Sequence, residues 1–195
     1  MVRQYLAFCI VLLFIVSCGN GSSDSSTAKK YENNTELFLD YELGMTKEDF
    51  YDQSWKLNDK GLVKQGPSNQ SVYYKLDNEL DHPTQMYFYP SFYKDRVYQM
   101  RIRFEYKNWA PWNKNLYADS LQVEVLKLFE EWYGDGFVRK ETKKNKQIKS
   151  IYVKRDGNRQ ITVTTRGSQN VVAFITDVVA SKEMQSSQDQ NSDDS

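Results

Sequence analysis

One stretch sets the architecture of this chain: Arg96-Val97-Tyr98-Gln99-Met100-Arg101-Ile102-Arg103-Phe104-Glu105-Tyr106. From Tyr98 onward, every second residue is a large apolar or aromatic side chain, and polar or charged side chains lie between them. Successive side chains of a β-strand point to opposite faces of a sheet. The alternation therefore predicts an antiparallel strand that has one buried face and one face in water.

Seven other segments have strand composition, and they lie on both sides of this one. Asp156-Gly157 separates two of them and predicts a tight hairpin turn. The predicted strands are 62–65, 71–76, 85–89, 137–141, 148–155, 159–165 and 171–179.

Two helices are predicted, one before each group of strands. Thr46 is placed to cap the first helix, and Asp49 follows at the capping-box position. The second helix begins at Asp119 or Ser120, and Gly134 ends it. We expect the first helix to present an inner face formed by Phe50, Tyr51, Ser54, Trp55 and Leu57, and the second to present the stripe Leu121, Val125, Leu128, Phe129 and Trp132.

The two halves of the chain align at an offset of about 75 residues, although their identity is low. The predicted fold class is therefore α+β, built from two tandem helix-plus-antiparallel-sheet units at about 43–106 and 117–180. We expect both helices to pack on one face of the sheet. The exposed face would then carry Arg101, Arg103, Thr162 and Thr164. Coincidence among common element lengths is the alternative explanation of the alignment.

The N-terminus carries a second informative pattern. Arg3 precedes the apolar run 6–16, which is too short to span a bilayer. The run ends in Ile15-Val16-Ser17-Cys18, which resembles the lipobox of bacterial lipoproteins. That resemblance implies cleavage before Cys18 and lipid attachment to it, so that the membrane is one partner. An ordinary cleaved signal peptide is the alternative, but it would leave one unpaired thiol in an oxidising compartment.

Composition predicts four regions in the chain. They are a signal peptide at 1–17, a flexible tether at 18–35, a globular domain at 36–180 and a disordered acidic tail at 181–195. Loss of the signal changes the formal net charge from 0 to −1, which gives no electrostatic reason to expect a nucleic-acid partner. Gly19, rather than aspartate, follows the lipid-bearing cysteine and favours the outer membrane, with both of its faces left open.

The segment Gly44-Met45-Thr46-Lys47-Glu48 opens the first helix ahead of antiparallel strands. It resembles a motif shared by the β-lactamase inhibitor proteins and by the small lipoprotein of the outer-membrane β-barrel assembly machinery. The resemblance implies a non-enzymatic α+β domain that binds an envelope protein. The chain departs from the inhibitors by lacking their cysteines, and it is about twice the length of the folded domain of the assembly lipoprotein.

No catalytic, cofactor or metal site is predicted. His82 is the only histidine and precedes Pro83, which is typical of a loop residue. Asp77, Glu79 and Asp81 imitate the start of a calcium loop, but His82 and Phe88 occupy the positions that such a loop gives to glycine and glutamate.

The best candidate contact residues are Trp109 and Trp112, in Trp109-Ala110-Pro111-Trp112. They can stack on a sugar or on a partner's apolar side chain, or they can cover the sheet edge or the second helix. Two further groups have a similar pair of interpretations. An aromatic group is either hairpin core or a ligand platform, and a basic group is either a contact for anions or a solvated turn. The aromatic group is Tyr87, Tyr89, Phe92 and Tyr93. The basic group is Arg139, Lys140, Lys143, Lys144, Lys146 and Lys149.

These observations predict a lipid-anchored envelope protein that acts as a non-catalytic protein-binding or assembly module. A surface lipoprotein that binds glycans through Trp109 and Trp112 is the alternative.

Overall fold

The computed structural model describes residues 33–67, 70–76, 78–141 and 150–193. The signal segment, Cys18 and most of the predicted tether lie outside these ranges, as do Asp77 and the lysines of the basic group between 143 and 149.

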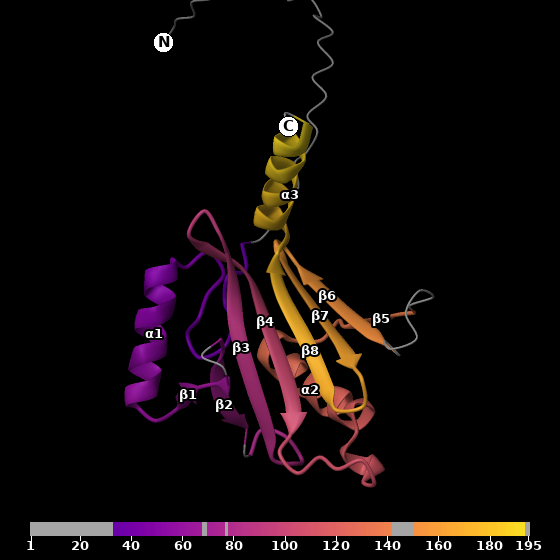
Figure 1. Ribbon diagram of the computed structural model, residues 1–195. Coiled ribbons are helices and arrows are strands. Elements are labelled where there is room, and N and C mark those ends of the chain that lie inside the picture. Colours follow the sequence, from indigo (N-terminus) through magenta and orange to yellow (C-terminus); the bar gives the residue numbers. More distant parts are fainter. Residues whose placement is uncertain (1–32, 68–69, 77, 142–149, 194–195) are drawn as a thin grey trace, which may run out of the picture. The chain divides into compact units, whose positions relative to one another are not determined.

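The described residues form an eight-stranded antiparallel sheet with three α-helices, which confirms the α+β class (Figure 1). The strand order across the sheet is β1-β2-β3-β4-β8-β7-β6-β5. The helices are α1 (Lys47–Asp59), α2 (Ala118–Tyr133) and α3 (Val178–Asp193), with a short 3-10 turn at Lys114–Leu116. The strands are β1 (Val63–Gln65), β2 (Val72–Leu76), β3 (Thr84–Tyr93), β4 (Arg96–Tyr106), β5 (Val138–Lys140), β6 (Ile151–Asp156), β7 (Arg159–Arg166) and β8 (Asn170–Asp177).

Strand β4 lies at the middle of the sheet and has the bounds that its alternation predicts. Met100, Ile102 and Phe104 are fully buried, whereas Arg101 is exposed. Because β4 pairs with both β3 and β8, it joins the two halves of the chain into one continuous sheet.

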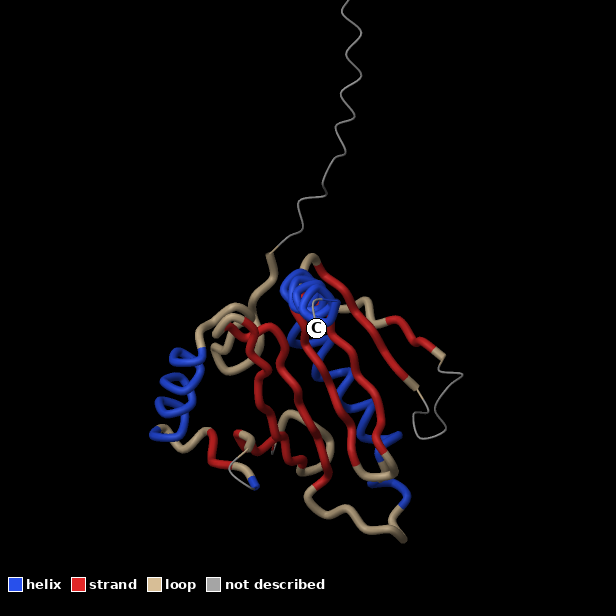
Figure 2. The backbone as a smooth tube through the Cα atoms, turned by 45° about the horizontal axis from the view of Figure 1, so that its top comes forward, coloured by secondary structure: helices blue, strands red, loops and turns tan. Residues whose placement is uncertain are grey.

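Helix α2 covers the apolar face of the sheet, and Figures 1 and 2 both show it crossing behind the central strands. Leu121, Val125 and Phe129 are fully buried on its inner side. The ring of Phe129 meets that of Phe104 edge-on, with centroids 5.8 Å apart. The helix ends before Gly134, whose φ of 78° is a conformation that a residue with a Cβ rarely adopts.

The segment before α1 covers the rest of the apolar face. Phe38 and Tyr41 are buried against Phe88 of β3, with ring centroids 4.9 and 5.3 Å away. Phe38 also stacks on Trp132 of α2 at 5.8 Å. This non-helical segment therefore fills the space in front of β3.

Helix α1 lies at the margin of the sheet in both views (Figures 1 and 2). Its capping box is confirmed, because the Asp49 amide donates to the Thr46 hydroxyl at 3.1 Å and the Thr46 amide donates to the Asp49 carboxylate. Its predicted inner face is wrong for Tyr51 and Trp55, which are exposed. Since the segment before the helix already covers β3, α1 buries only Phe50 and Leu57.

The two halves match in strand order but not in helix placement. Strands β1 to β4 run inward from one edge and β5 to β8 run inward from the other, and they meet at the β4–β8 pair. In contrast, α2 packs on the central strands, whereas α1 contacts the edge strand β1. The tandem-unit arrangement is therefore not confirmed.

The C-terminal segment departs from the predicted tail, because Val178–Asp193 forms α3. The Asp177 carboxylate caps it by accepting from the amides of Val179 and Ala180 at 2.9 and 3.1 Å. The helix contains no glycine or proline to break it. Within the described part of the chain, no helix is both long enough and apolar enough to cross a membrane.

Candidate functional site

Among the described elements, only α3 lies over the sheet face opposite α2, and it does so at one end of the sheet (Figure 1). The pairing registers align one residue from each central strand in every row. From the α3 end, the rows across β4, β8 and β7 are Gln99, Thr176 and Gln160, then Arg101, Phe174 and Thr162, then Arg103, Val172 and Thr164. We call this surface the open face.

Aromatic and cationic side chains meet on the open face at β2, β3 and β4. The guanidinium of Arg103 on β4 lies over the ring of Tyr87, 4.4 Å from its centroid. The ring of Tyr73 on β2 lies on the opposite flank of Tyr87, with the two ring centroids 5.4 Å apart. Arg103 also donates to Glu105 at 3.1 Å. Burial and the nearby Glu105 carboxylate raise the pKa of Tyr87, so its hydroxyl stays protonated at neutral pH. The sequence placed both arginines on this face, and it left Tyr87 with two interpretations, hairpin core or part of a ligand platform.

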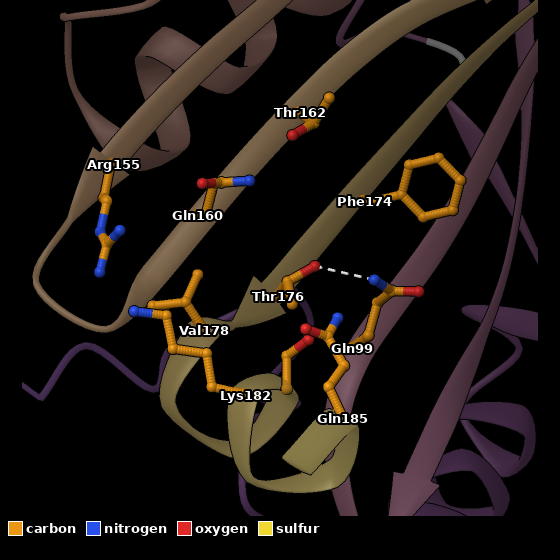
Figure 3. A pocket seen from close by; sticks show the side chains of 10 residues that line it. Gln99, Arg155, Gln160, Thr162, Phe174, Thr176, Val178, Lys182 and Gln185 are labelled. Atoms are coloured by element: carbon orange, nitrogen blue, oxygen red, sulfur yellow. Dashed lines mark hydrogen bonds between the residues drawn. The ribbon is translucent and has the colours of Figure 1, made fainter. Parts of the chain in front are cut away.

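A polar pocket of about 510 Å³ lies where the open face meets α3 (Figure 3). Gln99 donates to the Thr176 hydroxyl at 2.9 Å across its floor, and the Phe174 ring stands at one side. Arg155 and Lys182 are the charged residues of the lining, which contains no acid. The pocket therefore favours an anionic or hydrogen-bonding group.

Together, these features give the open face the chemistry of a protein-binding surface. Tyrosine and arginine are enriched in interface centres because they combine apolar area with hydrogen-bonding groups. Arg101 is exposed on this face, and Arg155 and Lys182 add positive charge at the pocket beside α3. A partner surface that carries acidic side chains would complement this arrangement.

The structure separates the two predicted tryptophans. Trp112 is 84% exposed, whereas Trp109 is half-buried against the hydrophobic core and tilts against the Tyr117 ring at 6.3 Å. The Tyr117 hydroxyl donates to the Pro111 carbonyl at 2.6 Å and fixes the loop. The two rings make no ring contact within the described residues, so they do not form one platform.

His82 lies in a cluster that the sequence did not reveal. Its Nδ1 is 3.0 Å from Oε1 of Glu124, which also accepts a hydrogen bond from the Tyr106 hydroxyl at 2.7 Å. Burial, then the hydrogen bond to the carboxylate, raise the pKa of Tyr106 well above its ordinary value. The Glu124 side chain is only 9% exposed, and the cluster ties the β2–β3 loop to α2.

The other predicted contact residues are divided among different surroundings. Phe92 packs against the core, the Tyr93 hydroxyl lies 3.1 Å from Ser187 of α3, and Tyr89 is exposed. Arg139 and Lys140 are exposed on β5, and the lysines that follow them lie outside the described residues.

Comparisons with known proteins found no match. No family model matches the chain, and no curated protein or solved structure is significantly similar to it.

Sequence reasoning missed Phe174 and Glu124. Val171, Val172, Ala173, Phe174 and Ile175 form an unbroken apolar run, which conceals which of them face outward. Glu124 looks like a solvated helix residue because its partners are 18 and 42 positions away.

Proposed function

We propose that this protein is a lipid-anchored lipoprotein of the bacterial cell envelope that binds another envelope protein without catalysis. The open face is the binding surface in this proposal, and the outer membrane is the location. The observation that carries it is the group Tyr73, Tyr87, Arg101 and Arg103, which combines aromatic area and charge on the sheet face that no described helix covers except α3 at one end.

The sequence supports the membrane anchor. The apolar run before Cys18 has the form of a lipoprotein signal, and two or more acyl chains anchor a protein stably. In this proposal the segment 18–35 is the tether between the membrane and the folded domain, because its Gly/Ser-rich start has the composition of a linker. Growth with labelled palmitate should label the wild-type protein and leave the Cys18→Ser variant unlabelled.

The symmetric strand order supports a duplicated four-stranded half as the origin of the sheet. In this proposal the two halves share the open face, so that a partner contacts β3 and β4 from one half and β7 and β8 from the other.

The binding surface is tested by crosslinking in intact envelopes followed by co-isolation. The double variant Tyr87→Ala/Arg101→Glu should lose the partner, because it removes aromatic area and reverses a charge at the centre of the face. The matched control is Val123→Ala/Glu131→Arg, whose positions are exposed on α2. Equal recovery of one partner by both variants would exclude the open face as the binding surface. Substrate turnover by the purified protein would overturn the proposal that the protein acts without catalysis.

A further inference from the structure

A second pocket lies between α1 and the sheet edge, far in sequence from the predicted tryptophan loop. Strand β2 stops pairing with β3 at Val72 and Phe88, but β3 continues to Tyr93. Helix α1 lies beside this step in the sheet edge and leaves a pocket of about 350 Å³. We call it the edge pocket.

Three aromatic side chains with exposed faces surround the edge pocket. Trp55 is 68% exposed, and Tyr51 and Tyr89 are each more than one-third exposed. Monomeric proteins rarely leave large apolar side chains exposed together unless they form a binding site. The Tyr51 and Tyr89 hydroxyls lie 2.8 Å apart, which fixes the two rings relative to each other.

The remaining wall of the pocket supplies hydrogen-bonding groups. The exposed Gln65 contributes a side-chain amide to the lining. Asn58 donates its amide to the Val63 carbonyl at 3.0 Å and keeps its oxygen available. Lys64 is the single charged residue of the lining. Flat rings beside uncharged amides and hydroxyls are suited to a neutral ligand that has apolar faces and a polar rim.

A peptide strand fits this pocket less well. The free edge of β3 begins with Tyr89-Pro90, and Pro90 has no backbone N–H to donate to an added strand. A glucose-type pyranose has the required chemistry, because its equatorial hydroxyls form a polar rim and leave axial C–H groups on both faces. We propose that the edge pocket binds a neutral, glucose-type saccharide, with its ring stacked on Trp55.

The test is titration of the full-length protein, in micelles of an amine-oxide detergent that contains no sugar, with cellopentaose. Tryptophan fluorescence and calorimetry report binding. Trp55→Ala should weaken binding by about tenfold or more, equivalent to ~1.4 kcal/mol. Trp112→Ala is the matched control, since it also removes an exposed tryptophan, and it should bind as the wild type does.

Two results would overturn the proposal: failure of the wild type to bind cellopentaose, or unchanged affinity in Trp55→Ala. Binding of N-acetyl-tryptophanamide at Trp55 without cellopentaose binding would assign the pocket to a protein side chain and would equally overturn it. Because Trp55 is exposed, its substitution leaves the core intact, and circular dichroism verifies this.

Discussion

Replacing Tyr106 with phenylalanine tests the most specific polar interaction of the interior. The Tyr106 hydroxyl donates to Oε1 of Glu124 at 2.7 Å, and the Tyr106 residue is 2% exposed. Without this hydroxyl, His82 is the one side chain among the described residues that still contacts the buried Glu124 carboxylate. A hydrogen bond to a charged group contributes about 1.5–3 kcal/mol, so we expect Tyr106→Phe to lower the free energy of unfolding by about 2 kcal/mol.

The assay is equilibrium urea unfolding of a chain that lacks residues 1–17 and carries Cys18→Ser. A loss of about 2 kcal/mol corresponds to a fall in Tm of about 4–8 °C for a domain of this size. The double variant Tyr106→Phe/Glu124→Leu removes both partners and should be more stable than the sum of the two single effects predicts. A loss below about 0.5 kcal/mol for Tyr106→Phe, or strict additivity in the double variant, would refute the reasoning.

Three further predictions follow from the structure. First, burial raises the pKa of Tyr41 and of Tyr74 to about 12 in the folded protein. Because these values exceed the unfolded value of 10, the contribution of the two tyrosines to the free energy of unfolding should be fully present below pH 10. It should be lost as the pH rises from 10 through 12. Thermal melts across that range check this, and a constant Tm would contradict it. Second, Arg159 donates to both Asp156 carboxylate oxygens and to the Glu36 carbonyl. Arg159→Met should therefore lower the free energy of unfolding in urea by about 2–4 kcal/mol. An unchanged urea midpoint would show that these hydrogen bonds do not hold the N-terminal segment. Third, Phe129→Ala should cost about 3–5 kcal/mol because its ring is fully buried, whereas Trp112→Ala should change stability by less than about 0.5 kcal/mol; similar losses in both variants would contradict the assigned burial.

The sequence predicts correctly those elements that are marked by a pattern within their own residues. The alternation in Arg96–Tyr106 locates β4 to the residue, and the Thr46–Asp49 pair marks the start of α1. The apolar stripe of α2 likewise identifies the buried side of that helix.

The features that depend on competition between distant segments could not be predicted in this way. The periodicity of α1 does not show that residues 37–43 take the place in front of β3, so the exposure of Trp55 is visible only in the folded chain. The polar sequence of α3 resembles a tail because its cap at Asp177 and its contacts with Tyr93 and Lys94 lie outside it. The partners of Glu124 are similarly invisible to local patterns.

The most direct test of the open face as the binding surface is photo-crosslinking in living cells. A photo-reactive amino acid replaces Arg101 in the full-length protein, and the control replaces Val123, which is exposed on α2. We expect irradiation to yield one defined protein adduct from position 101 and none from position 123. Adducts from position 123 alone, or identical adducts from both positions, would contradict it.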